Sequence, residues 1–214
     1  MTSPCRLCHG ETFLFFEAVK PFEARYERCL RCELVQMEKS RLLEPEEEKN
    51  KYLIHENSKR DPGYIEFLYQ CLGPTLNYLK SGNKGLDFGC GPYPMAAELM
   101  REEGYEMDCY DPHFYPSPQS LNKTYAFVIA TEVVEHFNNP AAAWSKLRRL
   151  VEKNGVLSIR TSFLYPHVDF LGWHYRRDMT HVCFYSPKTL RWLAKNFNLQ
   201  ILEELKNVAV FKKL

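Results

Sequence analysis

A glycine-rich turn preceded by an acid is the part of this chain best suited to bind a ligand. Residues 85–92 read GLDFGCGP, in which residues 86–88 predict the end of a short buried strand. Gly89 and Gly91 predict a sharp turn that lets the backbone approach a bound molecule. A helix is expected after Pro94, because apolar residues follow it at helical spacing. A strand, turn and helix of this kind can hold a small molecule against backbone N–H groups.

The charge of Asp87 restricts which molecule the turn can hold. Dinucleotide-binding folds place a pyrophosphate at such a turn, and the Asp87 carboxylate would repel it. S-adenosylmethionine has no phosphate, and its ammonium and sulfonium groups favour a nearby carboxylate. The sequence therefore favours S-adenosylmethionine over a nicotinamide cofactor. The predicted contacts are Asp87, Gly89, Cys90 and Gly91.

Polar residues also follow the next two predicted strands. Asp111 and Pro112 follow the second strand, at the distance where an acid in a βαβ unit meets a ribose. A carboxylate there can accept hydrogen bonds from both ribose hydroxyls; a turn-forming aspartate before proline is the alternative. The third strand, YAFVIA, is followed by Thr131 and Glu132. Because open α/β sheets bind ligands at the carboxyl ends of their strands, we expect all four residues at the cofactor site.

On four stretches the chain resembles the class I S-adenosylmethionine-dependent methyltransferases. They are LDFGCG (86–91), YDP (110–112), TEVVEHF (131–137) and NGVLSIRT (154–161). The resemblance covers about residues 81–214 and implies an α/β, Rossmann-like sheet of strand order 3-2-1-4-5-7-6 whose last strand is antiparallel. It also implies that the glycine turn contacts the methionine part of the cofactor, and that the acid after strand two holds the ribose. Segments 199–205 and 208–214 fit the terminal hairpin.

Two departures from the family pattern affect the cofactor site. Tyr93 stands where the family often has a third glycine. Only 13 residues, 112–124, separate the second strand's acid from the next strand, which is too few for the usual helix and third strand. We therefore expect a shortened strand 3 region, in which Phe114, Leu121 or Asn122 closes the adenine side.

Two Cys-x-x-Cys pairs near the N-terminus have the spacing of a metal site. Cys5 and Cys8 are separated from Cys29 and Cys32 by 20 residues, which allows four thiolates to bind one tetrahedral zinc ion. A region of about 35 residues buries too small a core to fold unaided, so bound metal would supply the missing stability. We expect a structural zinc ion in a ribbon module over residues 1–38. Disulfides are the alternative.

A zinc ribbon ahead of a class I methyltransferase domain resembles two known groups. These are sugar C-methyltransferases of antibiotic pathways and certain ribosomal RNA guanine methyltransferases, and the second likeness implies a ribbon that helps to grip RNA. Basic residues surround the second cysteine pair, but acidic residues alternate with them, which favours a solvated mixed face over a phosphate-binding one. The residues are Arg25, Arg28 and Arg31, and Glu23, Glu27 and Glu33.

Histidines dominate the segments expected near the acceptor. Methyl transfer from a sulfonium is an in-line displacement, so the enzyme must align the acceptor and, where the acceptor atom bears a proton, remove it. A histidine with a pKa near neutrality suits that step. The candidate bases are His181 and His136, then His174, and Asp178 or Glu135 would orient one of them. An ordinary hydrogen-bonded loop residue is the alternative for each histidine.

Two helices are expected between the ribbon and the sheet, in a linker over residues 39–80. The acidic segment 45–48 suits the start of the first helix. The second should begin near Pro62 and break or kink at residues 73–74, which are Gly-Pro. Helices at this place commonly cover the cofactor in the family. The lid candidates are Tyr52, His55, Asn57 and Tyr64, with an ordinary helical linker as the alternative.

Composition narrows the function classes. The chain has 214 residues, 45% of them hydrophobic, and 28 basic against 27 acidic side chains, which gives no general attraction to nucleic acid or anionic membrane. It contains no apolar run of about 20 residues and no signal-peptide pattern, so we expect a cytoplasmic protein without a membrane partner. Arg176 and Arg177 offer either a contact to an anionic acceptor or solvent-facing charge.

These observations favour methyl transfer to a small molecule. The near-neutral charge and the histidine-rich loop of residues 173–187 support it. An RNA or protein methyltransferase that docks its substrate on the ribbon is a second hypothesis, and a non-catalytic cofactor-binding relative is a third. The acceptor and the oligomeric state stay open, because fold analogy carries no substrate.

Overall fold

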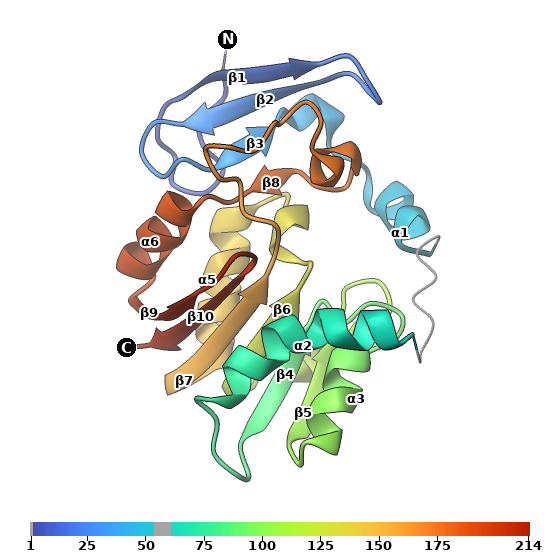
Figure 1. Ribbon diagram of the computed structural model, residues 1–214, viewed down its shortest axis with the longest axis vertical. Coiled ribbons are helices and arrows are strands. Elements are labelled where there is room, and N and C mark those ends of the chain that lie inside the picture. Colours follow the sequence, from blue (N-terminus) through green and yellow to red (C-terminus); the bar gives the residue numbers. More distant parts are fainter. Residues whose placement is uncertain (1, 54–60) are drawn as a thin grey trace.

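The structure, a computed structural model, describes residues 2–53 and 61–214. Two of the lid candidates, His55 and Asn57, lie outside the described residues. These described residues form one sheet of six strands and a second sheet of four strands nearer the N-terminus (Figure 1). None of the helices in the described ranges has the length and hydrophobicity that crossing a membrane requires.

The central sheet has the strand order β5-β4-β6-β7-β10-β9. Its strands are β4 (Lys84–Phe88), β5 (Glu106–Tyr110), β6 (Tyr125–Thr131), β7 (Val151–Arg160), β9 (Leu199–Glu204) and β10 (Val208–Lys213). The first four are parallel, and β10 is antiparallel to both of its neighbours. This is the expected order without its outermost strand. Residues 112–124 hold only the short helix α4 (Pro118–Leu121) and one isolated bridge, between Asp111 and Tyr115.

Helices pack on both faces of this sheet (Figure 1). α2 (Pro62–Leu76) and α3 (Met95–Glu102) cover one face, and α5 (Pro140–Leu150) and α6 (Pro187–Asn196) cover the other. Along β6, Phe127 and Ile129 enter the core beneath α2 and α3, whereas Val128 and Ala130 enter the core beneath α5 and α6. A strand buried on both faces needs an almost continuous apolar sequence, which YAFVIA provides.

The linker helices agree with the predicted starts. α1 (Pro45–Leu53) begins at the acidic segment, and Asp61 caps α2 by accepting a hydrogen bond from the Gly63 backbone N–H at 2.9 Å. α2 does not end at Gly73 and Pro74, because it continues through the proline to Leu76. Beside this proline, which has no N–H to donate, the hydroxyl of Thr75 donates to the Cys71 carbonyl at 2.7 Å.

The N-terminal sheet is built from two distant parts of the chain. β1 (Thr12–Ala18), β2 (Ala24–Cys29) and β3 (Val35–Met37) form an antiparallel sheet. The fourth strand, β8 (Cys183–Phe184), comes from the histidine-rich loop and pairs with β3 (Figure 1). The core of this lobe is continuous with the core beneath α5 and α6. A ribbon confined to residues 1–38 therefore describes only part of the lobe.

Candidate functional site

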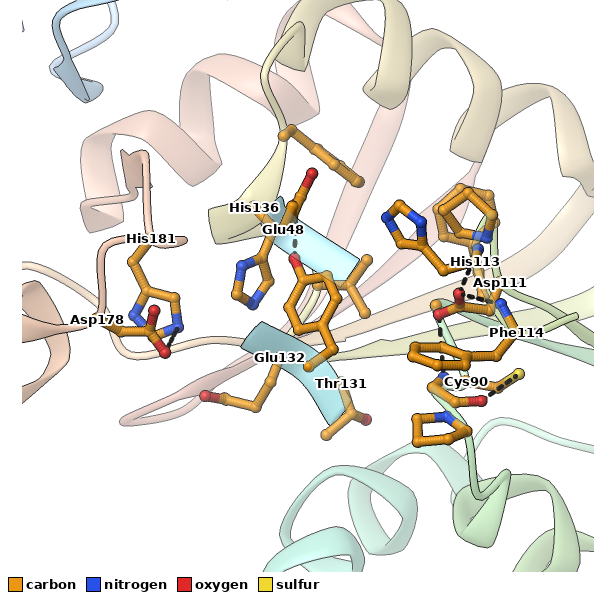
Figure 2. Close-up of a pocket in the computed structure, with 18 of the residues that line it drawn as sticks. Glu48, Cys90, Asp111, His113, Phe114, Thr131, Glu132, His136, Asp178 and His181 are labelled. Carbon is orange, nitrogen blue, oxygen red and sulfur yellow. Dashed lines mark hydrogen bonds and ion pairs between the residues drawn. The ribbon is translucent and has the colours of Figure 1, made fainter. Parts of the chain in front are cut away.

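A cavity of about 950 Å³ lies at the carboxyl ends of β4, β5 and β6. Its lining includes every predicted cofactor and catalytic residue apart from Asp87 and Glu135. These residues are Gly89, Cys90, Gly91, Asp111, Pro112, Thr131, Glu132, His136, His174, Asp178 and His181. Figure 2 shows Asp111 and Cys90 on one side of the cavity and His136, Asp178 and His181 on the other. The edge of the sheet thus brings the predicted cofactor-binding residues and the predicted catalytic residues into one cavity.

The glycine turn needs glycine at two positions, for different reasons. Gly89 has φ +77° and Gly91 has φ +63°, both in the left-handed region that favours glycine. A Cβ on Gly89 would also lie 2.5 Å from Cγ2 of Val133, whereas a Cβ on Gly91 would meet nothing within 4 Å. The Gly89 N–H donates to the Tyr110 carbonyl at 2.7 Å, which fixes the turn against the end of β5.

Asp111 organises the loop after β5. Its carboxylate accepts hydrogen bonds from the backbone N–H groups of Gly91 at 3.1 Å, His113 at 2.8 Å and Phe114 at 3.1 Å. A carboxylate has about four acceptor positions, so it keeps some capacity for a ligand hydroxyl. Phe114 and His113 line the cavity beside it (Figure 2). Two other adenine-side candidates, Leu121 and Asn122, are not among the lining residues.

Asp87 lies behind the glycine turn. Only 3% of it is exposed, and its carboxylate accepts a hydrogen bond from the Ala97 backbone N–H in α3 at 3.3 Å. Burial, with a smaller contribution from the nearby thiol of Cys109, raises the pKa of this carboxyl to about 8. The predicted contact at the cavity surface is therefore not seen: Asp87 supports the start of α3 under the turn.

Glu132 is held at the end of β6 by a charged partner that the sequence did not identify. It has φ +55°, and its Oε1 accepts a hydrogen bond from Nη1 of Arg160 at 2.5 Å. The Arg160 guanidinium also lies 3.5 Å from the centre of the Phe67 ring. Burial raises the pKa of Glu132, and the positive charge of Arg160 opposes that rise. The parallel register of β6 and β7 could have identified this partner, because it places Arg160 beside Thr131.

His136 and His181 face each other on the side of the cavity opposite Asp111 and Cys90 (Figure 2). Their ring centres are 4.8 Å apart. Nδ1 of His136 lies 3.0 Å from the Thr180 carbonyl oxygen, and Nδ1 of His181 lies 2.7 Å from the Tyr175 carbonyl oxygen. Because a carbonyl oxygen only accepts, each Nδ1 must carry the proton and each neutral ring has its lone pair on Nε2. Oδ2 of Asp178 lies 3.9 Å from Nε2 of His181.

Glu135 is fully buried in the 3-10 turn η2 (Val134–His136), behind the cavity wall. Its Oε1 accepts a short hydrogen bond from the Tyr175 hydroxyl and lies 4.0 Å from Nε2 of His136. The Tyr175 hydroxyl also lies 2.9 Å from Oγ1 of Thr161. Burial raises the pKa of Glu135 well above its ordinary value, and the charge of Glu132 adds to that rise. Sequence reasoning assigned no role to Tyr175, or to Thr161 at the end of the family-like stretch 154–161.

The four N-terminal cysteines come together and are all buried. Sγ of Cys5 lies 3.6 Å from Sγ of Cys32, and Sγ of Cys8 lies 3.3 Å from Sγ of Cys29. Tetrahedral zinc with Zn–S bonds of about 2.3 Å separates its sulfur ligands by about 3.8 Å. Backbone N–H groups of Arg31 and Cys32 point at the Cys29 sulfur, at 3.3 and 3.5 Å. The donor set and its spacing therefore fit a zinc ion.

Comparison with known families decides the class of the protein. A family model for a methyltransferase domain matches residues 57–204. This chain belongs to that methyltransferase family. The prediction of a methyltransferase is thereby confirmed at the level of the family. A search of curated proteins found no match.

Solved structures share the fold of this methyltransferase at low sequence identity. A Burkholderia thailandensis 1,6-didemethyltoxoflavin-N1-methyltransferase, solved with its namesake compound and S-adenosylhomocysteine, has a TM-score of 0.57 and 10% identity. The similarity covers 94% of this chain and 98% of that one. LaPhzM has a TM-score of 0.50 and 11% identity over 71% of this chain and 56% of its own. CalO1, a methyltransferase in calicheamicin biosynthesis, has a TM-score of 0.49 and 11% identity, over 78% of this chain and 68% of its own.

Other predicted residues of the methyltransferase take different places. His174 is exposed at the edge of the cavity in η3 (His174–Arg177). Arg176 is 1% exposed, and its guanidinium donates to the Phe170 carbonyl at 3.0 Å and the Leu171 carbonyl at 3.1 Å. It therefore neither binds an anion in the cavity nor faces solvent, and both expectations for it were wrong. Arg177 is exposed.

Two lid candidates do line the cavity of the methyltransferase. Tyr64 comes from α2 and Tyr52 from α1. The Tyr52 hydroxyl donates to Oε1 of Glu48 at 2.6 Å, and its ring centre lies 5.3 Å from that of His136 (Figure 2). α1 thus contacts the side of the cavity that His136 lines.

The arginines near the second cysteine pair are engaged with neighbouring groups. Arg25 forms an ion pair with Glu17 at 2.8 Å, and the Arg28 guanidinium lies 4.0 Å from the centre of the Phe15 ring. Nη1 of Arg31 donates to the Cys8 carbonyl at 3.5 Å. The alternating charges of this face therefore resemble a solvated surface more than a phosphate-binding one.

Proposed function

We propose that this methyltransferase binds S-adenosylmethionine at the glycine turn and transfers its methyl group to a small molecule at the histidine end of the same cavity. The observation that carries the proposal is the single space of about 950 Å³ that both ends line. Small-molecule sites commonly measure about 300 to 1,000 Å³. A methyl donor and a compact acceptor both fit in such a cavity. A folded macromolecule would instead have to insert its acceptor group through the opening of the cavity.

The donor is assigned to the side of the cavity near β4 and β5. Backbone N–H groups of the Gly89–Gly91 turn would meet the methionine part, and Asp111 would accept hydrogen bonds from the ribose. Phe114 would pack against the adenine, which the short segment after β5 leaves with few other partners. Bound S-adenosylmethionine supplies the reactive methyl group, and the protein supplies its alignment.

The acceptor is assigned to the side that His136, Asp178 and His181 line. Each imidazole carries its lone pair on Nε2 when neutral, so either ring can take a proton from an acceptor atom. Asp178 lies where it would stabilise a protonated His181, at 3.9 Å. We therefore infer that His181 is the leading general base and His136 the second. Glu135 would act indirectly: it accepts the hydrogen bond of the Tyr175 hydroxyl, and the Tyr175 carbonyl in turn accepts the hydrogen bond of His181 Nδ1.

A structural zinc ion is the second part of the proposal. The four thiolates would hold it with no position left for substrate, so it would stabilise the N-terminal lobe and take no part in chemistry. Metal analysis of freshly purified protein should give about one zinc ion per chain for this site. A preparation that folds fully and holds no zinc would contradict the assignment.

Labelled methyl transfer from S-adenosylmethionine into a fractionated cell extract tests the acceptor class. Label in the metabolite fraction is the expected result, since the net charge of +1 and the engaged arginines provide no basic face for RNA. Label in RNA or protein would contradict a small-molecule acceptor while retaining methyl transfer. Absence of label in every fraction would contradict the proposed activity.

A further inference from the structure

Glu135, His136 and His181 have the composition and spacing of a metal site. One ligand atom of each lies within 4.8 Å of the others. Two imidazoles and one carboxylate form a donor set that takes divalent first-row transition ions such as Mn²⁺, Fe²⁺, Co²⁺ and Zn²⁺. We propose that these three side chains bind one such ion at the acceptor end of the cavity, in a site separate from the four cysteines.

The hydrogen bonds behind both histidines prepare them as ligands. Nδ1 of His136 donates to the Thr180 carbonyl, and Nδ1 of His181 donates to the Tyr175 carbonyl. Each ring is thereby held with its lone pair on Nε2. Histidines that bind metal ions almost always donate their other N–H in this way, which fixes both the tautomer and the orientation of the ring. Both carbonyls come from the segment that carries His181 itself.

The buried carboxylate supplies an independent observation. Glu135 is 0% exposed, and the Tyr175 hydroxyl donates to its Oε1. Its Oε2 has no hydrogen-bond partner among the residues that the structure describes. A buried carboxylate oxygen without a partner is costly, and a bound cation would satisfy it. The Tyr175 hydrogen bond would then orient the carboxylate as an outer partner of the ion.

The distances require only small adjustments. The other oxygen of the same carboxylate, Oε1 of Glu135, lies 4.0 Å from Nε2 of His136, which places the carboxylate beside that ring. A tetrahedral ion with bonds of about 2.0 to 2.1 Å holds its ligand atoms about 3.3 Å apart. The widest separation in the cluster, at most 4.8 Å, must therefore shorten by about 1.5 Å or less, within reach of side-chain rotation. Asp178 lies beside His181, where it can receive a hydrogen bond from water on the ion.

The position of the cluster gives the ion a role in acceptor choice, a consequence that rests on the proposed function. His136 and His181 line the cavity, so the open positions of the ion would face the acceptor. A divalent cation lowers the pKa of a bound hydroxyl, which favours acceptors with a hydroxyl group. The hydroxyl loses its proton to solvent water, its oxygen forms the bond to the methyl carbon, and S-adenosylhomocysteine leaves as the methyl–sulfur bond breaks. In the metal-bound chain both histidines act as ligands, and the base role proposed for His181 applies to the chain without the ion.

Titration of Co²⁺ into the zinc-loaded full chain tests the site. We expect one Co²⁺ per chain beyond the zinc, with a visible spectrum of nitrogen and oxygen ligands and without the charge-transfer bands of thiolates. Glu135→Gln and His181→Gln should each weaken Co²⁺ binding about tenfold or more. His174→Ala is the matched control, because it alters a histidine of the same cavity outside the cluster, and should leave Co²⁺ binding unchanged.

Donor binding measured on the same samples separates this inference from the proposed function. Chain that binds S-adenosylmethionine but no Co²⁺, or variants that bind Co²⁺ as the wild type does, would overturn the metal site alone. Chain that binds Co²⁺ but no S-adenosylmethionine would support the metal site and contradict the proposed donor.

Wild-type chain allows a further test should the variants fail to fold. Paramagnetic Co²⁺ should shift or broaden the imidazole NMR signals of His136 and His181 at lower concentration than that of His167, which stacks on Tyr165 outside the cavity lining. The reverse order would overturn the site.

Discussion

At the scale of single residues, the turn needs glycine at positions 89 and 91 for different reasons. Both have positive φ, but only Gly89 is in close contact with Val133. Gly91→Ala should therefore lower the free energy of unfolding by about 1 to 2 kcal/mol, the cost of a left-handed alanine. Gly89→Ala should cost more, because Cβ would also displace Val133. Urea denaturation of both variants measures the difference.

Combining Gly89→Ala with Val133→Ala provides the control for that comparison. Removing the Val133 methyl groups should bring the cost of Gly89→Ala, measured in the Val133→Ala background, down toward that of Gly91→Ala. Equal costs for the two single glycine variants would contradict the packing argument.

Asp87 should give the methyltransferase a pH-dependent stability. The folded chain keeps a proton on this carboxyl up to about pH 8, because burial raises its pKa, whereas the unfolded chain loses the proton near pH 4. The folded state thus binds more protons between these values, and the contribution of Asp87 to the free energy of unfolding falls as pH rises from about 4 to about 8. Asp87→Asn keeps an acceptor for the Ala97 N–H and removes the charge.

Denaturation of wild type and Asp87→Asn across this pH range measures the effect. The stability of the variant relative to the wild type should rise between pH 4 and pH 8. A difference independent of pH would show that the carboxyl is ionised in the folded chain throughout the range.

At the scale of elements, β8 joins the N-terminal lobe to the loop that carries His181. β8 pairs with β3, and the Met37 backbone N–H donates to the Val182 carbonyl at 3.0 Å, next to His181 in the chain. Removal of zinc should therefore increase hydrogen exchange both in residues 24–37 and in residues 182–185. Hydrogen exchange in the Gly89–Gly91 turn, which follows β4 of the central sheet, should change little.

Hydrogen exchange before and after chelation, or in Cys29→Ser, measures this coupling. Increased exchange restricted to residues 1–38 would show instead that the ribbon is an independent module, as its cysteine spacing alone suggests.

Local patterns predicted the elements well where the residues that matter are close in sequence. The apolar run YAFVIA became β6, Gly-x-Gly became a left-handed turn, and the cysteine pairs met. The short segment after Asp111 predicted a shortened strand 3 region, and residues 112–124 contribute no strand to the central sheet. Pairing of β3 with β8 was not predictable, because about 150 residues separate the partners and two residues of strand carry no periodic signal.

The outline of the site was predictable because it follows from the order of the strands. Parallel strands deliver the residues after them to one edge, which placed Asp111, Thr131 and His136 around one cavity. Side-chain direction was not predictable: Asp87 turns under α3, and Arg176 is buried among backbone carbonyls. Those orientations depend on packing between segments that lie far apart in the sequence.

At the scale of the whole molecule, charge predicts weak interaction with RNA. The net charge is +1, and arginines of the N-terminal lobe are engaged by Glu17, by Phe15 and by a backbone carbonyl. Binding to RNA depends on release of counterions by a contiguous basic surface. Filter binding at physiological salt should therefore detect little retained RNA. Tight binding that falls steeply with salt would contradict the small-molecule assignment.

The central claim is that one cavity holds donor and acceptor at opposite ends, and calorimetric titration with S-adenosylmethionine tests it most directly. Wild type should bind one donor per chain. Asp111→Ala should lose most of that binding, and His181→Gln should keep it while losing methyl transfer. Absence of donor binding in the wild type, or equal loss of binding in both variants, would contradict this division of the cavity.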